Sequence, residues 1–270
     1  MTITATIAAD VPEDAYHSGA WLPEPSLSVS AAKRLLRTSP ARWKWEQENR
    51  KTKPVFEFGK AAHAKVLGIG ATVATMPADL LAKNGAESTA AAKAFRAEHE
   101  EAGEVVLKSA DVAVIDAMAT AIENHREAFA LLSSGTAEES MACRDPETLI
   151  LMRGRTDWVT EWHGVPVIVD YKTCDDAAPD EFRWQARKFD YHMQDAWYRQ
   201  MRDEITGQPH GFLFIAQEKT PPYLVSVVQL DDESRARGHE RNRQARALWL
   251  DCMTRDQWPA YPGITTVSIP

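Results

Sequence analysis

Two charged residues at the end of an apolar run are the first candidates for chemistry. Val167-Ile168-Val169 leads directly into Asp170-Tyr171-Lys172. Because residues two apart on a strand point to the same face of a sheet, Asp170 and Lys172 would stand side by side. Burying such a pair is costly unless another charge lies between them, and a divalent metal ion with a phosphate would meet that need. A plain ion pair at a strand end explains the same tripeptide, so catalysis needs support from other residues.

That support comes from a second carboxylate and a histidine. Asp157 falls on the neighbouring predicted strand, where a suitable register brings it close to Asp170. Two carboxylates and the backbone carbonyl of Tyr171 are the oxygen ligands that Mg²⁺ (or Mn²⁺) prefers. Lys172 would then orient or deprotonate a water and offset charge on the phosphate in the transition state. His63 could complete the ligand set, although a lone histidine among small residues is more often a satisfied core residue.

The elements that would position these residues follow one another closely. From Glu138 the apolar period changes to two, which predicts an antiparallel meander of strands over 138–144, 149–161 and 165–173, with Asp157 on the middle strand. A helix over 179–202 comes next. Its residues Tyr191, Gln194 and Tyr198, spaced i, i+3 and i+7, share one face. Strands over 211–217 and 223–230 and a helix over 232–252 complete this half.

The first half is predicted to be more helical. Residues 1–25 lack periodicity and predict a flexible N-terminal arm. Ser30 is the expected N-cap of a short helix that ends near Ser39-Pro40. Further predicted elements are a short helix over 43–48, a helix over 56–67 that carries His63, an Ala-rich helix over 88–102, a strand over 104–108 and a helix over 109–132. Together they predict an α/β (α+β) fold, a central mixed sheet flanked by helices, in a single domain over 26–270.

Composition and charge limit the classes of function. The net charge is −8, yet residues 33–65 hold ten Lys and Arg against three Glu, a local +7. That segment could meet phosphates, and a solvated basic face explains it equally well. The three cysteines are far apart, which argues against disulfides and against a cysteine-only metal site. No apolar run approaches the roughly 18 residues of a membrane span and no secretory signal is visible, so we expect a cytoplasmic protein without membrane contact.

An ordered set of motifs now supports a resemblance. The chain resembles the PD-(D/E)xK nuclease superfamily and, within it, the nuclease domain of the RecE-type exonucleases (exonuclease VIII), over roughly residues 26–268. The motifs are Ser28-x-Ser30, Ser39-Pro40, Gly59-Lys60-Ala61-Ala62-His63, Ala137-Glu138, Asp145-Pro146-Glu147-Thr148, Arg155-x-Asp157, Asp170-Tyr171-Lys172-Thr173, Tyr191-His192-Met193-Gln194-Asp195-Ala196-x-Tyr198 and Trp258-Pro259. Asp-x-Lys alone is weak, whereas the ordered set is specific.

The resemblance implies a metal-dependent, ATP-independent exonuclease that degrades one strand of linear double-stranded DNA from its 5′ end and leaves a 3′ single strand. It implies one or two Mg²⁺ or Mn²⁺ ions, a ring-shaped homo-oligomer and a RecT-type annealing partner, in phage or prophage recombination. Carried over by motif, His63, Asp157, Asp170 and the Tyr171 carbonyl resemble the metal ligands and Lys172 the catalytic lysine. Glu138, or its neighbour Glu139, together with Gln194 and Tyr198 would complete the site.

The sequence leaves several alternatives open. One of three arginines could hold the 5′ phosphate of DNA, although a plain surface charge explains each of them better: Arg34, Arg37 and Arg42. Arg155, two residues before Asp157, could contact a backbone phosphate or pair with a carboxylate. A RecB-type or CRISPR-type nuclease of other polarity would need four clustered cysteines. A restriction endonuclease would need a separate sequence-reading domain. A non-catalytic DNA-binding protein of the same fold would keep the motifs without cleavage.

Overall fold

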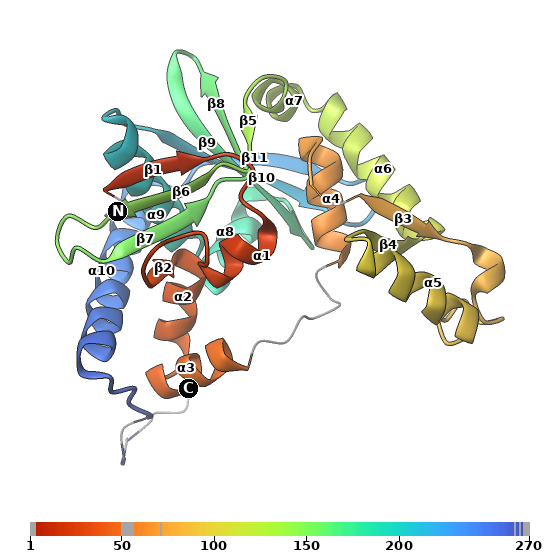
Figure 1. The fold of residues 1–270 in the computed structure, drawn as a ribbon. Helices are drawn as coiled ribbons and strands as arrows, with labels where there is room; N and C mark the ends of the chain where they lie inside the picture. Colours follow the sequence, from red (N-terminus) through yellow and green to blue (C-terminus); the bar gives the residue numbers. More distant parts are fainter. Residues whose placement is uncertain (1–3, 50–56, 71, 262, 265, 267–270) are drawn as a thin grey trace.

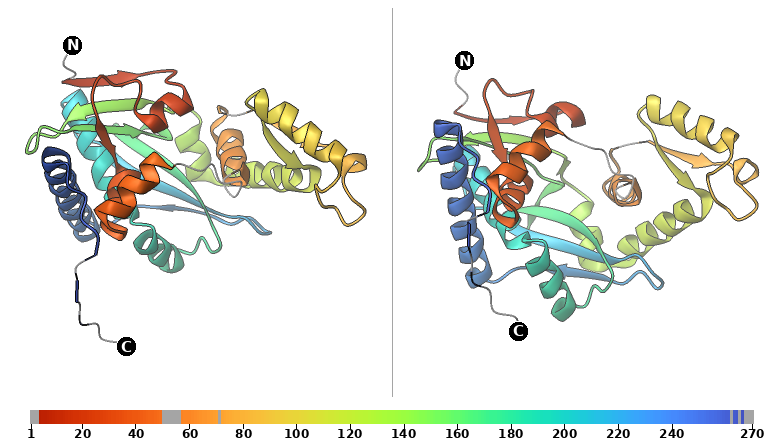
Figure 2. Two further views of the ribbon diagram at one scale, coloured as in Figure 1. Left: turned by 60° about the horizontal axis from the view of Figure 1, so that its bottom comes forward. Right: turned by 90° about the horizontal axis from the view of Figure 1, so that it is seen from below.

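Two β-sheets form the body of the protein, and a smaller helical part projects from one side of them (Figures 1 and 2). The computed structural model describes residues 4–49, 57–70, 72–261, 263, 264 and 266. The strands are β1 (Ala5–Ala8), β2 (Ser26–Ser28), β3 (Val73–Met76), β4 (Val105–Lys108), β5 (Thr136–Ala137), β6 (Ser140–Arg144), β7 (Leu151–Arg155), β8 (Trp158–Trp162), β9 (Val165–Cys174), β10 (Gly211–Glu218) and β11 (Val225–Val228). The helices are α1 (Glu13–Ser18), α2 (Val29–Arg37), α3 (Pro40–Glu48), α4 (Glu57–Leu67), α5 (Ala90–Glu101), α6 (Ser109–Asn124), α7 (Arg126–Leu132), α8 (Pro179–Lys188), α9 (Tyr191–Thr206) and α10 (Asp232–Arg255).

The larger sheet has the order β11-β10-β9-β8-β5, and the smaller one has the order β1-β6-β7-β2. In the larger sheet β9 runs parallel to β10 and antiparallel to β8. In the smaller sheet β2 runs parallel to β7, and β6 is antiparallel to both of its neighbours. Both sheets are therefore mixed and flanked by helices, which confirms the predicted α/β class.

The predicted continuous meander is wrong at its middle strand. β7 ends at Arg155 and belongs to the smaller sheet, while β8 begins at Trp158 and pairs with β9 in the larger one. Between them the backbone amide of Thr156 donates to the carbonyl of Glu139 at 3.1 Å, and that of Glu138 donates to the carbonyl of Asp157 at 3.0 Å. Strands that switch sheets bend at such a corner. Asp157 therefore lies at the junction of the two sheets instead of inside a strand.

The N-terminal segment, for which the sequence predicted a flexible arm, contains the strand β1 and the helix α1. β1 pairs antiparallel with β6, with Ala5 opposite Cys143, and so forms the edge of the smaller sheet. In α1, the carboxylate of Glu13 pairs with the ammonium of Lys60 on α4 at 2.6 Å. The segment thus bridges the smaller sheet and the helix that carries His63.

Three of the differences from the predicted helices have a local cause. α2 is capped by Ser28, whose hydroxyl accepts from the amide of Ala31, and not by Ser30. The predicted helix over 179–202 is two helices, because Asp190 adopts a left-handed conformation with φ 51° between α8 and α9. The predicted helix over 109–132 likewise divides at His125, which has extended backbone angles and caps α7 through its ring.

The core lies on both faces of β9, whose side chains alternate between them. Ile168 packs with the cluster that includes α2, α9 and α10, around Trp197 and Phe212. Val169 and Tyr171 pack with α4 and α6 on the opposite face. Helix α9 contacts β6 and β7 of the smaller sheet and β10 of the larger one, so it spans the junction between the sheets.

The projecting part is built on the parallel pair β3 and β4 (Figure 2). Met76 and Val106 pack against α5 on one face, while Leu107 packs with α4 and α6 on the other. Among the described residues, no helix is both long enough and apolar enough to cross a membrane.

Candidate active site

Asp170 and Lys172 lie on one face of β9, at the edge of the core. Asp170 is completely buried, and its Oδ2 forms an ion pair with the ammonium of Lys172, which is partly exposed. The two charges are in direct contact, whereas the resemblance predicts a gap between them for a metal ion, a water and a phosphate. The contact follows from the strand period, which places residues 170 and 172 on the same face.

Helix α9 supplies the partner of the other carboxylate oxygen. The side-chain amide of Gln194 donates to Oδ1 of Asp170 at 2.5 Å, and its carbonyl oxygen accepts from the ammonium of Lys33 at 3.3 Å. The ammonium groups of Lys33 and Lys172 each lie 5.5 Å from the centre of the Tyr191 ring. The two lysines therefore share one aromatic neighbour, and Gln194 links Lys33 to Asp170.

Asp157 reaches the same region from the junction of the sheets. Trp158 pairs with Val169, so continuing the antiparallel register by one step places Asp157 opposite Asp170. Its Oδ2 accepts a hydrogen bond from the backbone amide of Tyr171 at 3.0 Å. The break between β7 and β8 thus frees the Asp157 side chain to bond to the backbone between Asp170 and Lys172.

His63 approaches from α4. Its Nε2 lies 3.2 Å from Oδ2 of Asp157, and its Nδ1 lies 3.8 Å from Oε1 of Glu138. Glu138 has a left-handed backbone with φ 48°. Its neighbour Glu139 points elsewhere and pairs with Arg202 at 2.7 Å. Of the two glutamates, the structure therefore places Glu138 beside the other predicted site residues.

The two aspartates differ in their ionisation. Burial, together with the negative charge of Asp157, raises the pKa of Asp170 to about 6, although Lys172 acts in the opposite direction. Burial also acts to raise the pKa of Asp157, but the charges of His63 and Lys172 outweigh it and the pKa is lowered. Asp157 therefore loses its proton at a lower pH than Asp170. The repulsion between the two carboxylates appears as the raised pKa of Asp170.

The cations respond in the complementary way. Burial acts to lower the pKa values of His63 and Lys172, but the nearby carboxylates, Asp157 for His63 and Asp170 for Lys172, raise both. Burial and the charge of Lys172 lower the pKa of Lys33 to about 7. Lys172 therefore remains charged at neutral pH, while Lys33 is close to its titration point.

These residues fit a hard divalent cation by donor type. The carboxylates of Asp157 and Asp170 repel each other in a buried place, which a cation would relieve. His63 and the Tyr171 carbonyl are further donors. Among the described residues, however, no three His, Cys, Asp or Glu side chains are already grouped as metal ligands. His63 and Lys172 instead each engage one of the carboxylates.

Tyr198 lies one layer behind these groups. It is buried beneath Gly154 of β7, where an added Cβ would come within 2.9 Å of its ring. It lies close to Tyr16 on α1, whose pKa burial raises to about 12. The guanidinium of Arg155 lies 4.3 Å from the Tyr16 ring centre. The predicted helix face therefore divides, with Gln194 at Asp170 and Tyr198 behind the sheet junction.

The four candidate arginines all have partners within the protein. Arg34 and Arg42 both pair with Glu46, Arg34 through two nitrogens. Arg37 donates to Asp190 at 2.6 Å. Arg155 donates to the hydroxyl of Ser140 at 2.9 Å and to the carbonyl of Val11 at 2.5 Å.

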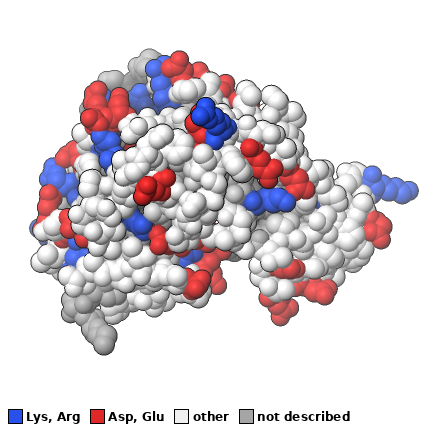
Figure 3. Space-filling view, turned by 90° about the horizontal axis from the view of Figure 1, so that it is seen from above, with Lys and Arg blue, Asp and Glu red and all other residues white. Residues whose placement is uncertain are grey.

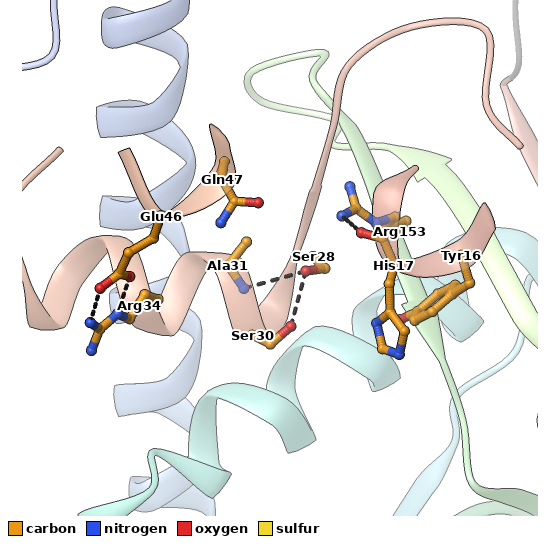
Figure 4. Close-up of a pocket in the computed structure, with 9 residues that line it drawn as sticks. All are labelled: Tyr16, His17, Ser28, Ser30, Ala31, Arg34, Glu46, Gln47 and Arg153. Carbon is orange, nitrogen blue, oxygen red and sulfur yellow. Dashed lines mark hydrogen bonds and ion pairs between the residues drawn. The ribbon is translucent and has the colours of Figure 1, made fainter. Parts of the chain in front are cut away.

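Arg34 differs from the other three because it borders a cavity of about 300 Å³. Figure 4 shows this cavity between α1, α2 and β7, with Ser28, Ser30 and Ala31 at the start of α2 on one side and Tyr16, His17 and Arg153 on the other. Hydroxyls, a helix N-terminus and arginines are groups that bind phosphate.

Lys33 and Tyr16 were not among the predicted site residues. In the sequence, Lys33 falls within the basic segment 33–65 and Tyr16 within the predicted N-terminal arm. Their neighbours Gln194 and Tyr198 are far away in the sequence, and a single sequence carries no sign of such pairings.

On the face shown in Figure 3, acidic and basic side chains are interspersed. The charge total alone therefore does not locate a binding surface.

Comparison with known proteins places this geometry in a family. Residues 28–267 match the family described as a PDDEXK-like domain of unknown function (DUF3799). The chain belongs to this PDDEXK-like family. The match covers nearly all of the described elements and confirms the predicted PD-(D/E)xK superfamily. The narrower RecE-type assignment stays a prediction.

One solved structure shares the fold of this chain. A protein from Eubacterium rectale, described as a "putative exonuclease", superposes with a TM-score of 0.60 at 15% identity, over 95% of this chain and 97% of the other. SSO0001 gives a TM-score of 0.33 at 10% identity, over 84% and 81% of the two chains. Protein VC1899 from Vibrio cholerae gives 0.26 at 9%, over 93% and 59%. The last two scores carry no weight for the fold. No curated protein matches the sequence.

Proposed function

We propose that this PDDEXK-like protein is a metal-dependent nuclease that hydrolyses phosphodiester bonds of DNA. One observation carries the proposal. Asp157 and Asp170, which repel each other, lie with Lys172 at the junction of two sheets, where Gln194 and His63 engage them. Paired carboxylates beside a lysine are the groups that metal-assisted phosphate hydrolysis needs.

Asp157, Asp170, the Tyr171 carbonyl and His63 would hold Mg²⁺ or Mn²⁺. When bound, such an ion supplies Lewis-acid polarisation of the phosphate and a water of lowered pKa. The nearby carboxylates raise the pKa of Lys172, so its ammonium stays charged at neutral pH and would orient the attacking water and offset the charge that develops on the phosphate. Gln194 fixes the Asp170 carboxylate through its 2.5 Å hydrogen bond, and Glu138 holds the far side of His63.

The finer proposal is an ATP-independent exonuclease that starts at the 5′ ends of linear double-stranded DNA and leaves 3′ single-stranded overhangs for recombination by strand annealing. The motif resemblance supports it, as does the name of the Eubacterium rectale protein. Arg34 is the favoured contact for a 5′ phosphate because it borders the cavity at the start of α2. Arg37 and Arg42 are not among the residues that line this cavity. Arg155 is proposed to order the junction, given its bonds to Ser140 and Val11.

The same resemblance supports the proposed partners, a RecT-type annealing protein and further copies of this chain in a ring. A ring would also explain how a chain of net charge −8 stays on DNA, because encirclement replaces part of the phosphate contacts. The proposed location is the cytoplasm.

The test is nucleotide release from linear duplex DNA with Mg²⁺ and with EDTA, using duplexes labelled at either the 5′ or the 3′ end. Release with Mg²⁺ only, lost in Asp170→Ala, is expected. Early loss of the 5′ label identifies 5′-to-3′ polarity, and a closed circular duplex should stay intact. The Arg34→Ala variant should lose its preference for 5′-phosphorylated ends, with Arg42→Ala as the matched control on the same Glu46. Release that is absent in the wild type, or that survives Asp170→Ala, would contradict the nuclease proposal.

A further inference from the structure

Helix α8 carries large aromatic and basic side chains on its exposed side. Trp184 is 51% exposed and Phe189, just after the helix, is 43% exposed. The guanidinium groups of Arg183 and Arg187 lie 5.1 and 5.9 Å from the Trp184 ring centre, and the ammonium of Lys188 lies 5.4 Å from that of Phe189. We name these five residues the aromatic-basic strip: Arg183, Trp184, Arg187, Lys188 and Phe189.

The strip begins at the candidate active site. The Phe189 ring stacks on Tyr191, with ring centres 5.9 Å apart and planes at 24°. Tyr191 is the ring that both Lys33 and Lys172 approach to 5.5 Å. An exposed aromatic surface therefore continues directly from the ring beneath the lysines of the site.

The strip is also held firmly against the site. The side-chain amide of Gln185 donates to the carbonyl of Thr173 on β9 at 3.2 Å and to the hydroxyl of Tyr191 at 3.3 Å. On the opposite side of α8, Phe182 and Ala186 are buried in the core. The orientation of the exposed side of α8 relative to Lys172 is thus fixed by packing and by hydrogen bonds.

The charge of the strip favours an anionic partner. Asp180 lies 3.7 Å from Arg183, and both side chains are largely exposed, so that pair is weak. Among the described residues, neither Arg187 nor Lys188 has a carboxylate within ion-pair distance. Asp180 and Glu181 lie in the first turn of the helix, whereas Arg187 and Lys188 lie in its last turn. The positive end of the strip is therefore the end beside the site.

We propose that the aromatic-basic strip binds single-stranded nucleic acid. Phosphates would lie on Arg187 and Lys188, and unpaired bases would stack on Trp184 and Phe189. Exposed rings among cations suit single strands because the base faces of a duplex are already stacked on one another. The inference deepens the proposed function, since the strand held by the strip is the one that would lead into or away from Lys172.

The experiment measures binding of a fluorescently labelled oligo-dT to the whole 270-residue chain in EDTA, where no cleavage occurs. Trp184→Ala should weaken binding about tenfold, which is the size of one lost base stack. The matched control is Trp45→Ala, since Trp45 on α3 is also highly exposed, at 59%, but lies outside the strip. Replacing both Arg187 and Lys188 by Gln should also weaken binding and reduce its dependence on salt concentration.

The outcomes separate this inference from the proposed nuclease. If Trp184→Ala binds oligo-dT as tightly as the wild type does, the proposal that the strip binds single strands is overturned, even if the wild type cleaves DNA. Loss of self-association in Trp184→Ala, with unchanged oligo-dT affinity, would assign the strip to a protein interface and would also overturn the inference. If Trp184→Ala weakens oligo-dT binding but the wild type does not cleave DNA, the proposed single-strand binding is supported and the proposed nuclease activity is contradicted.

Discussion

The ammonium of Lys33 donates to Oε1 of Gln194 at 3.3 Å, while the amide of the same glutamine donates to Oδ1 of Asp170 at 2.5 Å. Gln194 is therefore held at both ends, and its amide cannot turn over without losing both bonds. The arrangement fixes Asp170 from the side opposite Lys172. It gives Lys33 a role as a positioning residue.

Replacing Lys33 by Met should lower nuclease activity about 10- to 100-fold, since groups that orient a metal ligand have effects of this size. The reason is that Gln194 would lose the partner that fixes its amide. The fall should appear in kcat more than in KM, measured on a linear duplex with Mg²⁺. Lys93→Met, which removes an exposed lysine from α5, is the control. Equal activity of Lys33→Met and wild type would show that Gln194 needs no support from α2.

Mg²⁺ should raise the melting temperature of the protein because it would bind the folded state and relieve repulsion between Asp157 and Asp170. At a tenfold excess over Kd the gain is about 1.4 kcal/mol, or roughly 2–4 °C for a chain of this size. Since the Asp170 pKa is raised to about 6, protons compete and the gain should shrink below that pH. Asp157→Asn should lose the gain and Glu161→Gln, an exposed carboxylate on β8, should keep it. A gain of equal size in Asp157→Asn would place the ion elsewhere.

Gly154→Ala should destabilise the protein by about 1–3 kcal/mol, the usual cost of overpacking. The added Cβ would lie 2.9 Å from the Tyr198 ring and 3.1 Å from the Met201 sulfur. Gly59→Ala is a helical comparison, because nothing lies within 4 Å of its added Cβ. That change should stabilise the protein by about 0.5–1 kcal/mol. Urea unfolding of both variants provides the measurement, and a Gly154→Ala variant as stable as the wild type would contradict the packing of Tyr198.

The pH dependence of stability should carry a contribution from Asp195. This side chain is 1% exposed, neither carboxylate oxygen accepts a hydrogen bond, and Arg199 is 3.9 Å away. Burial raises its pKa from 3.8 to about 7. A raised folded-state pKa means that the folded protein binds the extra proton. This stabilisation is complete below about pH 4 and is lost as pH rises through about 7.

Asp195→Asn removes that dependence. Relative to the wild type, the variant should therefore gain up to about 4 kcal/mol of unfolding free energy between about pH 4 and pH 8, the equivalent of roughly three pKa units. Urea unfolding at several pH values gives the difference, in which any effect that is independent of pH cancels. A wild-type-minus-variant difference that stays flat over this range would show that Asp195 is ionised as readily in the folded protein as in the unfolded one.

Local sequence patterns predicted the centre of the site better than its surroundings. The common face of Asp170 and Lys172 follows from the two-residue period of a strand, and the nearness of Asp157 follows from pairing with the next strand along the chain. Both are short-range relationships. The junction at Asp157 was missed because strand propensity runs through residues 149–161 and only the two-sheet packing divides it.

Long-range partners account for the remaining differences. β1 has four residues and becomes a strand only by pairing with β6, which follows more than 130 residues later. Lys33 meets Gln194 across 161 positions. The helix break at Asp190 coincides with its ion pair to Arg37 on α2, again far away in the sequence. Such contacts are decided by tertiary packing, and periodicity within one segment carries no trace of them.

The edge position of β1 bears on how the protein can be shortened. A chain trimmed to begin at Ser26 would leave the backbone of β6 as an open edge, which invites pairing with a strand of another copy. It would also remove the carbonyl of Val11 and the ring of Tyr16 from Arg155, at the corner next to Asp157. The first residues of the chain therefore support the corner that holds Asp157, and a fusion partner is better attached at the other end of the chain.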